Sequence, residues 1–277
     1  MISTLKHLAY TLKVRTTKLE KVILHIDEYY YEKKELKLDN KGNVLLDKSG
    51  NEKFRILNPS IKQLKTIQKR IRINILSKLH IPDYAFGGIK GRDNIKNAKC
   101  HQGKKYVFTT DLKNFYPTIR NERVFEMFRS FHFSPTVAKV LTQLTTYKGR
   151  LPQGAPTSST IANLVFIKTG KKLQLFSIEN KLTFTSFVDD LAFSAPYDFK
   201  GKIPVLLETI KSDCYSISHK KTNYKTKNPI VTNLVVKNNK LELPNSFKVK
   251  LVNTKGYSQA QINGLKLYQE RVLMTNK

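Results

Sequence analysis

The sequence is poor in acidic residues and cysteine, and it lacks tryptophan and long apolar runs. It has 21 Asp and Glu against 50 Lys and Arg, which gives a formal net charge of +29 over 277 residues. Its two cysteines, Cys100 and Cys214, lack the CxxC spacing typical of a zinc site. No apolar run approaches the roughly 20 residues of a membrane span, and no Walker-type or GxGxxG loop occurs. These absences argue against a membrane-spanning protein, a P-loop NTPase and a dinucleotide-binding enzyme.

The positive charge extends along the whole chain. Residues 1–105 hold 24 basic and 10 acidic side chains, and residues 106–277 hold 26 and 11, so the two parts carry +14 and +15. With 40% apolar residues, the chain can bury a core and is not a disordered basic tail. A folded protein of this charge most often binds nucleic acid; an anionic membrane surface and simple solubility are the alternatives. The scarcity of cysteine and the lack of a secretion signal predict a cytoplasmic protein.

Strands alternate with helices in the middle of the chain, which predicts a layered α/β core. Lys105–Thr110 is predicted as a buried strand that ends at Asp111, and Ser158–Ser177 as a long apolar helix. Thr183–Ala195 is predicted as two strands that meet at Val188-Asp189-Asp190.

The remaining segments give local predictions. Residues 1–40 are predicted to be helical, 39–51 to form a loop or short hairpin, and 230–240 to form a hairpin that turns at Asn238-Asn239. Asn58-Pro59 is predicted to start a helix, with apolar residues every three or four positions up to Leu79. Five cations and no acid stand within eleven residues of this helix, which favours phosphate contact over an ordinary solvated face; they are Lys62, Lys65, Lys69, Arg70 and Arg72.

The positions of the acids point to the chemistry. Asp189 and Asp190 stand in an apolar segment, where adjacent like charges repel unless a cation compensates them. A turn that uses Asp for its conformational tolerance is the alternative. Asp111 ends a separate strand, so three carboxylates can meet at the strand ends. Three carboxylates suit Mg²⁺, and a basic protein with such a site is typically a polymerase or a nuclease.

The segment Leu151–Ser158 (LPQGAPTS) leads into the long apolar helix. One interpretation is a plain helix start with Thr157 or Ser158 as N-cap. The other is a loop whose backbone and Gln153 side chain line a nucleotide pocket. The loop considered alone favours neither.

Several segments occur in an order and spacing that match one enzyme family. They are Phe54-Arg55 with the helix that follows, Phe86–Arg92 (FGGIKGR), Asp111–Tyr116 (DLKNFY), Leu151–Ser158, Phe187–Asp190 (FVDD) and Lys221-Thr222. From about Lys53 to Lys237 the chain therefore resembles the reverse transcriptases, in which these segments are two fingers motifs and motifs A to D.

Two further segments resemble the bacterial retron type within that family. Asn97–His101 (NAKCH) is similar to the NAxxH signature, and Val231-Thr232-Asn233 lies where retron enzymes carry Val-Thr-Gly. Asn departs from the pattern in the third position, but it shares much of glycine's tolerance of positive φ. Phe187 is a second departure, since most relatives have Tyr there.

The resemblance implies roles for the acids and for Lys221. Asp111, Asp189 and Asp190 would bind two Mg²⁺ ions, with the Leu112 carbonyl as an additional ligand. Lys221 would protonate the departing pyrophosphate; the alternative is one more surface lysine in a basic run.

The resemblance also implies contacts with substrates. Tyr116 would be the steric gate that excludes a ribose 2′-hydroxyl, with a buried aromatic beside Phe115 as the alternative. Gln153 would contact the incoming dNTP and the template pair, and Arg55 and Arg92 would hold the triphosphate. The residues expected to contact RNA are Lys62, Lys65, Lys69, Arg72, Asn97 and His101, with a structural role as the alternative for His101.

The implied fold is a mixed α/β (α+β) fold of the right-hand polymerase type. Its expected parts are an N-terminal helical extension (1–52), fingers (53–105 with 121–150), a palm (106–240) and a short helical thumb (241–277). The implied reaction copies a structured non-coding RNA from dNTPs into a branched RNA–DNA molecule (msDNA), in anti-phage defence with an effector or toxin partner. The alternatives are another bacterial reverse transcriptase of group II intron or abortive-infection type, a nonenzymatic RNA-binding protein, and a metal-dependent nuclease.

Overall fold

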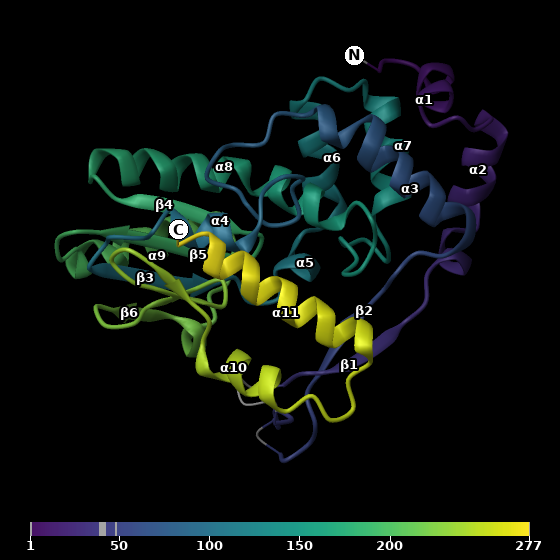
Figure 1. Ribbon diagram of the computed structural model, residues 1–277. Coiled ribbons are helices and arrows are strands. Elements are labelled where there is room, and N and C mark those ends of the chain that lie inside the picture. The colour runs from purple at the N-terminus through teal and green to yellow at the C-terminus, as the bar shows by residue number, and fades with distance from the viewer. Residues whose placement is uncertain (1, 39–42, 48, 277) are drawn as a thin grey trace. The chain divides into compact units, whose positions relative to one another are not determined.

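The computed structural model describes residues 2–38, 43–47 and 49–276, and the chain forms two compact units. Unit 1 comprises Met1–Pro82 and Asn114–Ile167, and unit 2 comprises Asp83–Lys113 and Lys168–Lys277 (Figure 1). The chain thus enters unit 2, returns to unit 1, and ends in unit 2. Within the described part of the chain, no helix is long and apolar enough to cross a membrane.

Unit 1 is mainly helical. It begins with α1 (Leu5–Thr11), α2 (Thr16–Leu24) and the 3₁₀ turn η1 (Ile26–Tyr29). Its further helices are α3 (Lys62–Asn74), η2 (Leu76–Lys78), α5 (Phe115–Thr118), α6 (Asn121–Ser130) and α7 (Pro135–Thr145). The predicted apolar spacing of α3 is confirmed, because Leu64, Ile67 and Ile71 are at most 1% exposed.

The start of α3 differs from the prediction. The helix begins at Lys62 rather than at Asn58-Pro59, and its N-cap residue Ile61 makes no side-chain cap bond. The Asn58 amide instead donates to the Gln153 carbonyl oxygen at 2.7 Å, and the Ile61 amide donates to the Tyr29 carbonyl oxygen at 2.8 Å. The segment before α3 is therefore not helical, because its backbone groups bond to other segments of unit 1.

A two-stranded ribbon follows the N-terminal helices. β1 (Lys33–Leu36) pairs antiparallel with β2 (Phe54–Leu57), and Glu35 stands opposite Arg55. The predicted N-terminal extension, 1–52, is therefore helical only as far as Tyr29. The loop or hairpin predicted for 39–51 lies partly outside the described residues.

Unit 2 is built on a four-stranded sheet with the strand order β4-β5-β3-β6. The strands are β3 (Tyr106–Asp111), β4 (Thr183–Phe187), β5 (Asp190–Ala195) and β6 (Asn223–Lys225), and all pairs are antiparallel. The predicted strand before Asp111 and the predicted pair of strands at 183–195 are confirmed. Alternate residues of a strand point to opposite faces, so the partners Phe108 and Phe193 lie on one face and Val107 lies on the other.

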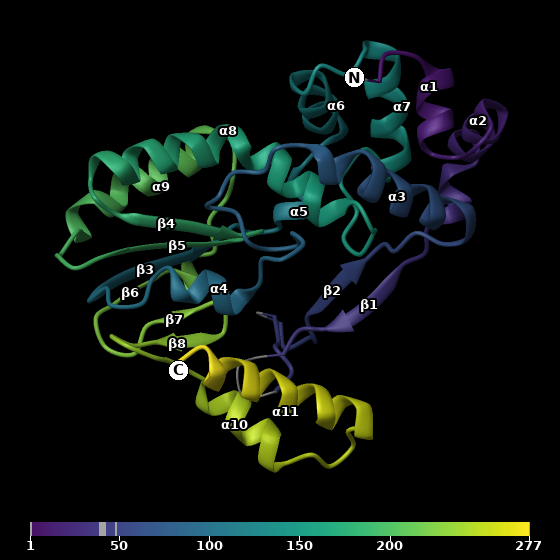
Figure 2. The ribbon, with the colours of Figure 1, turned by 45° about the horizontal axis from the view of Figure 1, so that its top comes forward.

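Helices and a small sheet cover this central sheet. α8 (Ser158–Glu179) confirms the predicted apolar helix. Its part within unit 2, from Lys168 on, and α9 (Ile203–Ser212) lie along one face (Figure 2). On the other face are α4 (Asn94–Lys99) and a second sheet of β7 (Ile230–Val231), β8 (Leu234–Val236) and β9 (Leu241–Glu242) (Figure 2). A shared core joins α4, both sheets and the C-terminal helix; its buried members include Ile95, Ala98, Val107, Ala192, Leu234 and Val272.

The chain ends in α10 (Asn245–Val252) and α11 (Gln259–Met274), both in unit 2. The hairpin predicted at 230–240 has two turns, because Val231 pairs with Leu234 and Val236 pairs with Leu241. The expected boundaries of fingers, palm and thumb stay predictions. Residues 83–105 belong to unit 2, since the apolar residues of α4 are buried in the core of that unit.

Candidate active site

The backbone of unit 2 brings three aspartates to one end of its sheet. Asp111 is the last residue of β3 and lies directly opposite Asp190, the first residue of β5. Val188 and Asp189 form the tight turn between β4 and β5. The Leu112 amide donates to the Asp189 carbonyl oxygen at 2.9 Å, which ties the end of β3 to this turn.

The turn that carries Asp189 is strained and closely packed. Val188 has a φ of 59°, in the left-handed region that β-branched residues rarely adopt. A Cβ at Gly87 would stand 2.6 Å from Val188 Cγ2 and 2.9 Å from the Val188 amide nitrogen. Only glycine fits this position without a shift of the turn. The role of Gly87 was not predicted, although the Gly87-Gly88 pair was an available signal of a close backbone approach.

Lys221 faces the aspartates from the 3₁₀ turn η4 (His219–Lys221). Its Nζ donates to Asp111 Oδ2 at 2.6 Å, while the Lys221 side chain remains 62% exposed. The Ser218 amide donates to the Asp111 carbonyl oxygen at 2.8 Å, so the backbone before η4 is tied to the same strand end. Lys221 is therefore an exposed lysine with a specific carboxylate partner, and its role as proton donor stays a prediction.

The charges at this site perturb one another. Enclosure of the carboxyl, together with the negative charges of Asp189 and Asp111, raises the pKa of Asp190 to about 7, and Lys221 opposes the shift. Partial burial by itself would lower the pKa of Lys221, but the hydrogen bond and charge of Asp111 raise it above its ordinary value.

The chemistry of these groups fits a hard divalent cation. The carboxyl groups of Asp111, Asp189 and Asp190 are close enough for their charges to disfavour the ionised form of Asp190. A cation such as Mg²⁺, which prefers oxygen ligands, would relieve the same repulsion. Among the described side chains, no three His, Cys, Asp or Glu residues form a closed metal site, and the ammonium of Lys221 is the cation that Asp111 contacts. The donor set therefore matches Mg²⁺ in kind, without a preformed coordination shell.

Arg92 and Leu112 also belong to unit 2. The Arg92 guanidinium donates to the Ala85 carbonyl oxygen at 2.6 Å and to Asp83 Oδ1 at 3.0 Å, so it holds its own loop. Leu112 is buried at 1% exposure. The triphosphate contact of Arg92 and the metal contact of the Leu112 carbonyl stay predictions.

The structure corrects the RNA contacts predicted for Asn97 and His101. Their exposures are 1% and 0%, so neither side chain has a surface from which to contact RNA. The ring nitrogens of His101, Nδ1 and Nε2, are each 2.7 Å from a hydroxyl, of Ser194 and Thr185 respectively. These partners lie on β5 and β4, so His101 joins the two strands whose turn carries Asp189. Burial lowers the pKa of His101 to about 3, and the ring is neutral.

In unit 1, Tyr116 follows Asp111 by five residues and lies in α5. Its neighbour Phe115 is buried and packs edge-on against Phe166, with ring centroids 6.0 Å apart. Tyr116 is only half-buried, and its hydroxyl lies 3.1 Å from Ser159 Oγ. The buried aromatic of this pair is therefore Phe115, and Tyr116 stays a predicted sugar-selecting residue.

The loop with Gln153 packs against the segment that follows β2. The Gln153 carbonyl oxygen accepts the Asn58 amide at 2.7 Å. Neither expected N-cap bond of α8 forms, because Thr157 Oγ1 and Ser158 Oγ are buried without a hydrogen-bond partner. The loop is thus not a plain capped helix start. Contacts of Gln153 and of the exposed Arg55 with a nucleotide stay predictions.

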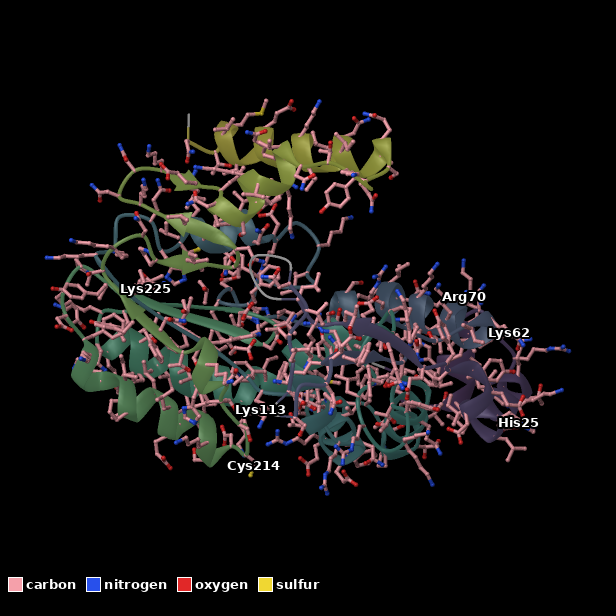
Figure 3. All side chains as sticks on the ribbon, turned by 90° about the horizontal axis from the view of Figure 1, so that it is seen from below. His25, Lys62, Arg70, Lys113, Cys214 and Lys225 are labelled. Atoms are coloured by element: carbon pink, nitrogen blue, oxygen red, sulfur yellow. The ribbon has the colours of Figure 1, made fainter. Side chains whose placement is uncertain are left out.

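The four α3 cations expected to contact RNA are solvent exposed. They are Lys62, Lys65, Lys69 and Arg72. Figure 3 labels Lys62 and Arg70. Unlike the four exposed cations, Arg70 is bonded within unit 1. Arg70 Nη1 donates to the carbonyl oxygens of Leu12 and Lys13 at 2.9 and 2.8 Å, so its charge holds the end of α1. The RNA contacts of the four exposed cations stay a prediction.

Known proteins similar in sequence to this chain include the segments that carry the aspartates and Lys221. The sequence profile described as reverse transcriptase (RNA-dependent DNA polymerase) matches residues 45–252, a range that includes the three aspartates and Lys221. The chain belongs to the reverse transcriptase family. Enzymes of this family use a divalent metal ion, typically Mg²⁺.

Its relatives include retron enzymes. The retron Se72 reverse transcriptase of Salmonella heidelberg (strain 579083-10) is 36% identical over 153 residues, which cover 55% of this chain and 40% of that protein. The retron Ec86 reverse transcriptase of Escherichia coli is 34% identical over 151 residues, which cover 54% of this chain and 47% of that protein. The retron Ec83 reverse transcriptase of Escherichia coli is 27% identical over 228 residues, which cover 79% of this chain and 68% of that protein. The matches make this a retron-type chain, although it spans less than half the length of the first two relatives.

A solved structure of telomerase from Candida albicans, in complex with a fragment of telomeric RNA, is similar in fold. The TM-score is 0.52 at 12% sequence identity, and the match covers 80% of this chain and 48% of that one. At this identity the similarity shows the fold alone. The mixed α+β fold of the right-hand polymerase type, which the sequence resemblance implied, is confirmed.

Proposed function

We propose that this chain is an RNA-directed DNA polymerase and acts as the reverse transcriptase of a retron in the bacterial cytoplasm. The observation that carries the proposal is the meeting of Asp111, Asp189 and Asp190 at paired strand ends, with Lys221 bound to Asp111. The family and the retron-type relatives support the same activity. The template is a structured non-coding RNA. The product is DNA joined to that RNA through a 2′ linkage (msDNA), and it serves anti-phage defence together with an effector or toxin protein.

The proposed chemistry is in-line nucleotidyl transfer. Asp111, Asp189 and Asp190 would hold two Mg²⁺ ions, with the Leu112 carbonyl as an additional ligand. When bound, the ions neutralise phosphate charge and activate the attacking hydroxyl. The 3′-hydroxyl of the primer loses its proton to solvent water as its oxygen forms a bond to the α-phosphorus of the dNTP, and the bond from the α-phosphorus to the oxygen that bridges to the β-phosphorus breaks. Lys221, whose raised pKa keeps it charged at neutral pH, gives a proton to the departing pyrophosphate.

The substrate contacts follow from the predicted residues. Tyr116 excludes a ribose 2′-hydroxyl, and Gln153 contacts the incoming dNTP and the template pair. Arg55 and Arg92 hold the triphosphate; Arg92 first releases its loop contacts with Asp83 and the Ala85 carbonyl. The exposed α3 cations contact the RNA backbone, as guanidinium and ammonium groups do through phosphate oxygens.

The test is the nucleic acid that co-purifies with the full chain when its genetic neighbourhood is expressed with it. A retron enzyme yields DNA that stays attached to RNA until a 2′-branch-specific debranching enzyme separates them. Unbranched cDNA would instead identify another bacterial reverse transcriptase. Bound RNA with no DNA, and no incorporation of added dNTPs, would identify a nonenzymatic RNA-binding protein.

A further inference from the structure

Helix α11 buries little apolar surface for its length. Of its 16 residues, only Val272 is buried. Leu267, Leu273 and Met274 are each more than half exposed. A helix that buries one side chain gains little from apolar packing, so its position depends on polar contacts.

Two polar contacts fasten α11 to the start of α4. Asn94 Nδ2 donates to the Tyr268 hydroxyl oxygen at 2.5 Å. Arg271 Nη2 donates to Asp93 Oδ2 at 2.5 Å. Asp93 is also the N-cap of α4, where its other carboxylate oxygen accepts the Lys96 amide at 2.9 Å. One aspartate therefore starts α4 and holds α11 at the same time.

The same end of α4 binds the turn between β7 and β8. Asn94 Nδ2 donates to the Thr232 carbonyl oxygen at 3.1 Å, and Thr232 Oγ1 lies 3.2 Å from both the Asn94 carbonyl oxygen and Asn97 Nδ2. Thr232 and Asn233 have φ values of 43° and 64°, which form the tight turn that presents Thr232 to α4. The NAxxH-like segment and the Val-Thr-Asn triplet therefore bind each other directly.

Apolar contacts join the same elements beneath this polar layer. Ile95 of α4, Val231 of β7 and Val272 of α11 belong to one buried core, and Tyr268 packs at its edge. Asn94 is the residue where the three elements meet, because its side-chain amide bonds to both Thr232 and Tyr268.

We propose that Asp93, Asn94, Thr232, Tyr268 and Arg271 form a clasp that fixes α11 on unit 2, with Asn94 as its central positioning residue. Of the two retron-like signatures, the Val-Thr-Asn triplet takes part in seating α11 through Thr232, and Asn97 of the NAxxH-like segment supports that contact through its bond to Thr232. Asn97 and His101 are buried, so the NAxxH-like segment does not contact RNA through these two side chains. The functional consequence rests on the proposed polymerase activity: a seated α11, in the segment expected to be the thumb, sets how tightly primer–template duplex is held, and not the rate of nucleotide transfer.

Hydrogen exchange of the α11 amides in the full chain tests the clasp directly. Asn94→Ala removes both side-chain bonds and should speed exchange across 259–274 by about tenfold, the effect of losing one or two hydrogen bonds. Asn263→Ala is the same change at an exposed position of α11, where the side chain accepts a bond from Gln259 Nε2 of the same helix and has no contact with the clasp; it should exchange like the wild type. Unchanged α11 exchange in Asn94→Ala would overturn the proposal.

Tyr268→Phe is the milder variant if Asn94→Ala does not fold, because it keeps the ring in the core and removes only the hydroxyl. Tyr257→Phe, at an exposed residue, is its matched control. Arg271→Lys should keep the ion pair with Asp93 and most of the protection, whereas Arg271→Ala should lose it.

The dissociation constant for a primer–template duplex and the single-turnover rate at saturating duplex give the functional readout. In Asn94→Ala and Tyr268→Phe the dissociation constant should rise several-fold while the rate stays unchanged. A reduced rate with unchanged α11 exchange would assign these residues to the chemistry and overturn the clasp. Failure of the wild type to bind duplex would overturn the proposed function, while the exchange experiment would still decide the clasp.

Discussion

Asp111 and Asp190 are direct partners in the antiparallel register of β3 and β5, at the ends of two neighbouring strands. Like charges directly opposite each other destabilise a sheet. Burial of the carboxyl and the charges of Asp189 and Asp111 together raise the pKa of Asp190 to about 7. A preference for Asp in the β4–β5 turn explains Asp189 and Asp190 but not their partner on β3. A site that binds a cation between the strands explains all three.

Replacement of Lys221 by methionine should have two separable effects. Incorporation of dNTPs should fall roughly 10²-fold, the usual contribution of a positioned proton donor. Mg²⁺ should stabilise the variant at lower concentrations than it stabilises the wild type, because Asp111 no longer has an ammonium partner. Single-turnover kinetics and thermal unfolding at increasing Mg²⁺ measure the two effects. Lys220→Met is the matched control, and a wild-type rate in Lys221→Met would contradict the assigned role.

Replacement of Tyr116 by alanine should admit ribonucleotides. The ratio of kcat/KM for dCTP to that for CTP on a primed RNA template should fall by at least about 10-fold, because the side chain that meets the 2′-hydroxyl is gone. Tyr116→Phe loses only the hydroxyl contact with Ser159 and should keep the selectivity. Equal sugar selectivity in Tyr116→Ala and wild type would place the gate on another residue.

The strands that carry the aspartates were predictable because their signal is local. The apolar runs before Asp111 and on either side of Asp189-Asp190 define two strand ends without knowledge of the rest of the chain. The start of α3 was not predictable, because the Asn58 amide bonds to Gln153 instead of capping a helix. The bond between Asn94 and Tyr268 was not predictable either, because the two residues are 174 positions apart in the sequence.

The role of His101 was also unpredictable from the sequence, because it depends on contacts with distant residues. A histidine before a predicted strand suits RNA contact and core packing equally. The choice depends on the hydroxyls of Thr185 and Ser194, which lie 84 and 93 residues further along the chain. For Asn233 the relevant property is local, because Asn tolerates positive φ, and the φ of 64° at this position is consistent with that tolerance.

Substitution of Gly87 by alanine should damage the active site without direct contact with substrate. The added Cβ would stand 2.6 Å from Val188 Cγ2, so the turn with Asp189 must move. We expect a loss of about 1–3 kcal/mol of unfolding free energy, typical of overpacking, and a large loss of dNTP incorporation. Chemical denaturation and primer extension measure the two. Gly201→Ala, where nothing lies within 4 Å of the added carbon, should behave like the wild type; equal behaviour of both variants would remove the role of Gly87.

The buried His101 should make the fold sensitive to acid. The unfolded chain binds a proton on this ring near pH 6.5, whereas the folded chain does so only near pH 3. Between these two pH values the unfolded state holds more protons than the folded state. The contribution of the neutral His101 to the free energy of unfolding is therefore complete above pH 6.5 and is lost as the pH falls toward 3. At pH 5 the loss should be about 2 kcal/mol. Urea denaturation of wild type and His101→Gln from pH 7.5 to 5 measures this loss, because the unfolding free energy of the variant should depend less steeply on pH. Parallel plots of unfolding free energy against pH for the two proteins would show that His101 is not buried as a neutral ring.

The most direct test of the three-aspartate site is dNTP incorporation by Asp189→Asn on a primed RNA template in Mg²⁺. The variant keeps the size and turn geometry of the side chain but loses its charge. Asp27→Asn, an exposed aspartate of η1 in unit 1, is the control that loses the same charge elsewhere. The predicted result is incorporation below detection in Asp189→Asn, with RNA binding retained and full activity in Asp27→Asn. Incorporation by Asp189→Asn at the wild-type rate would contradict the account.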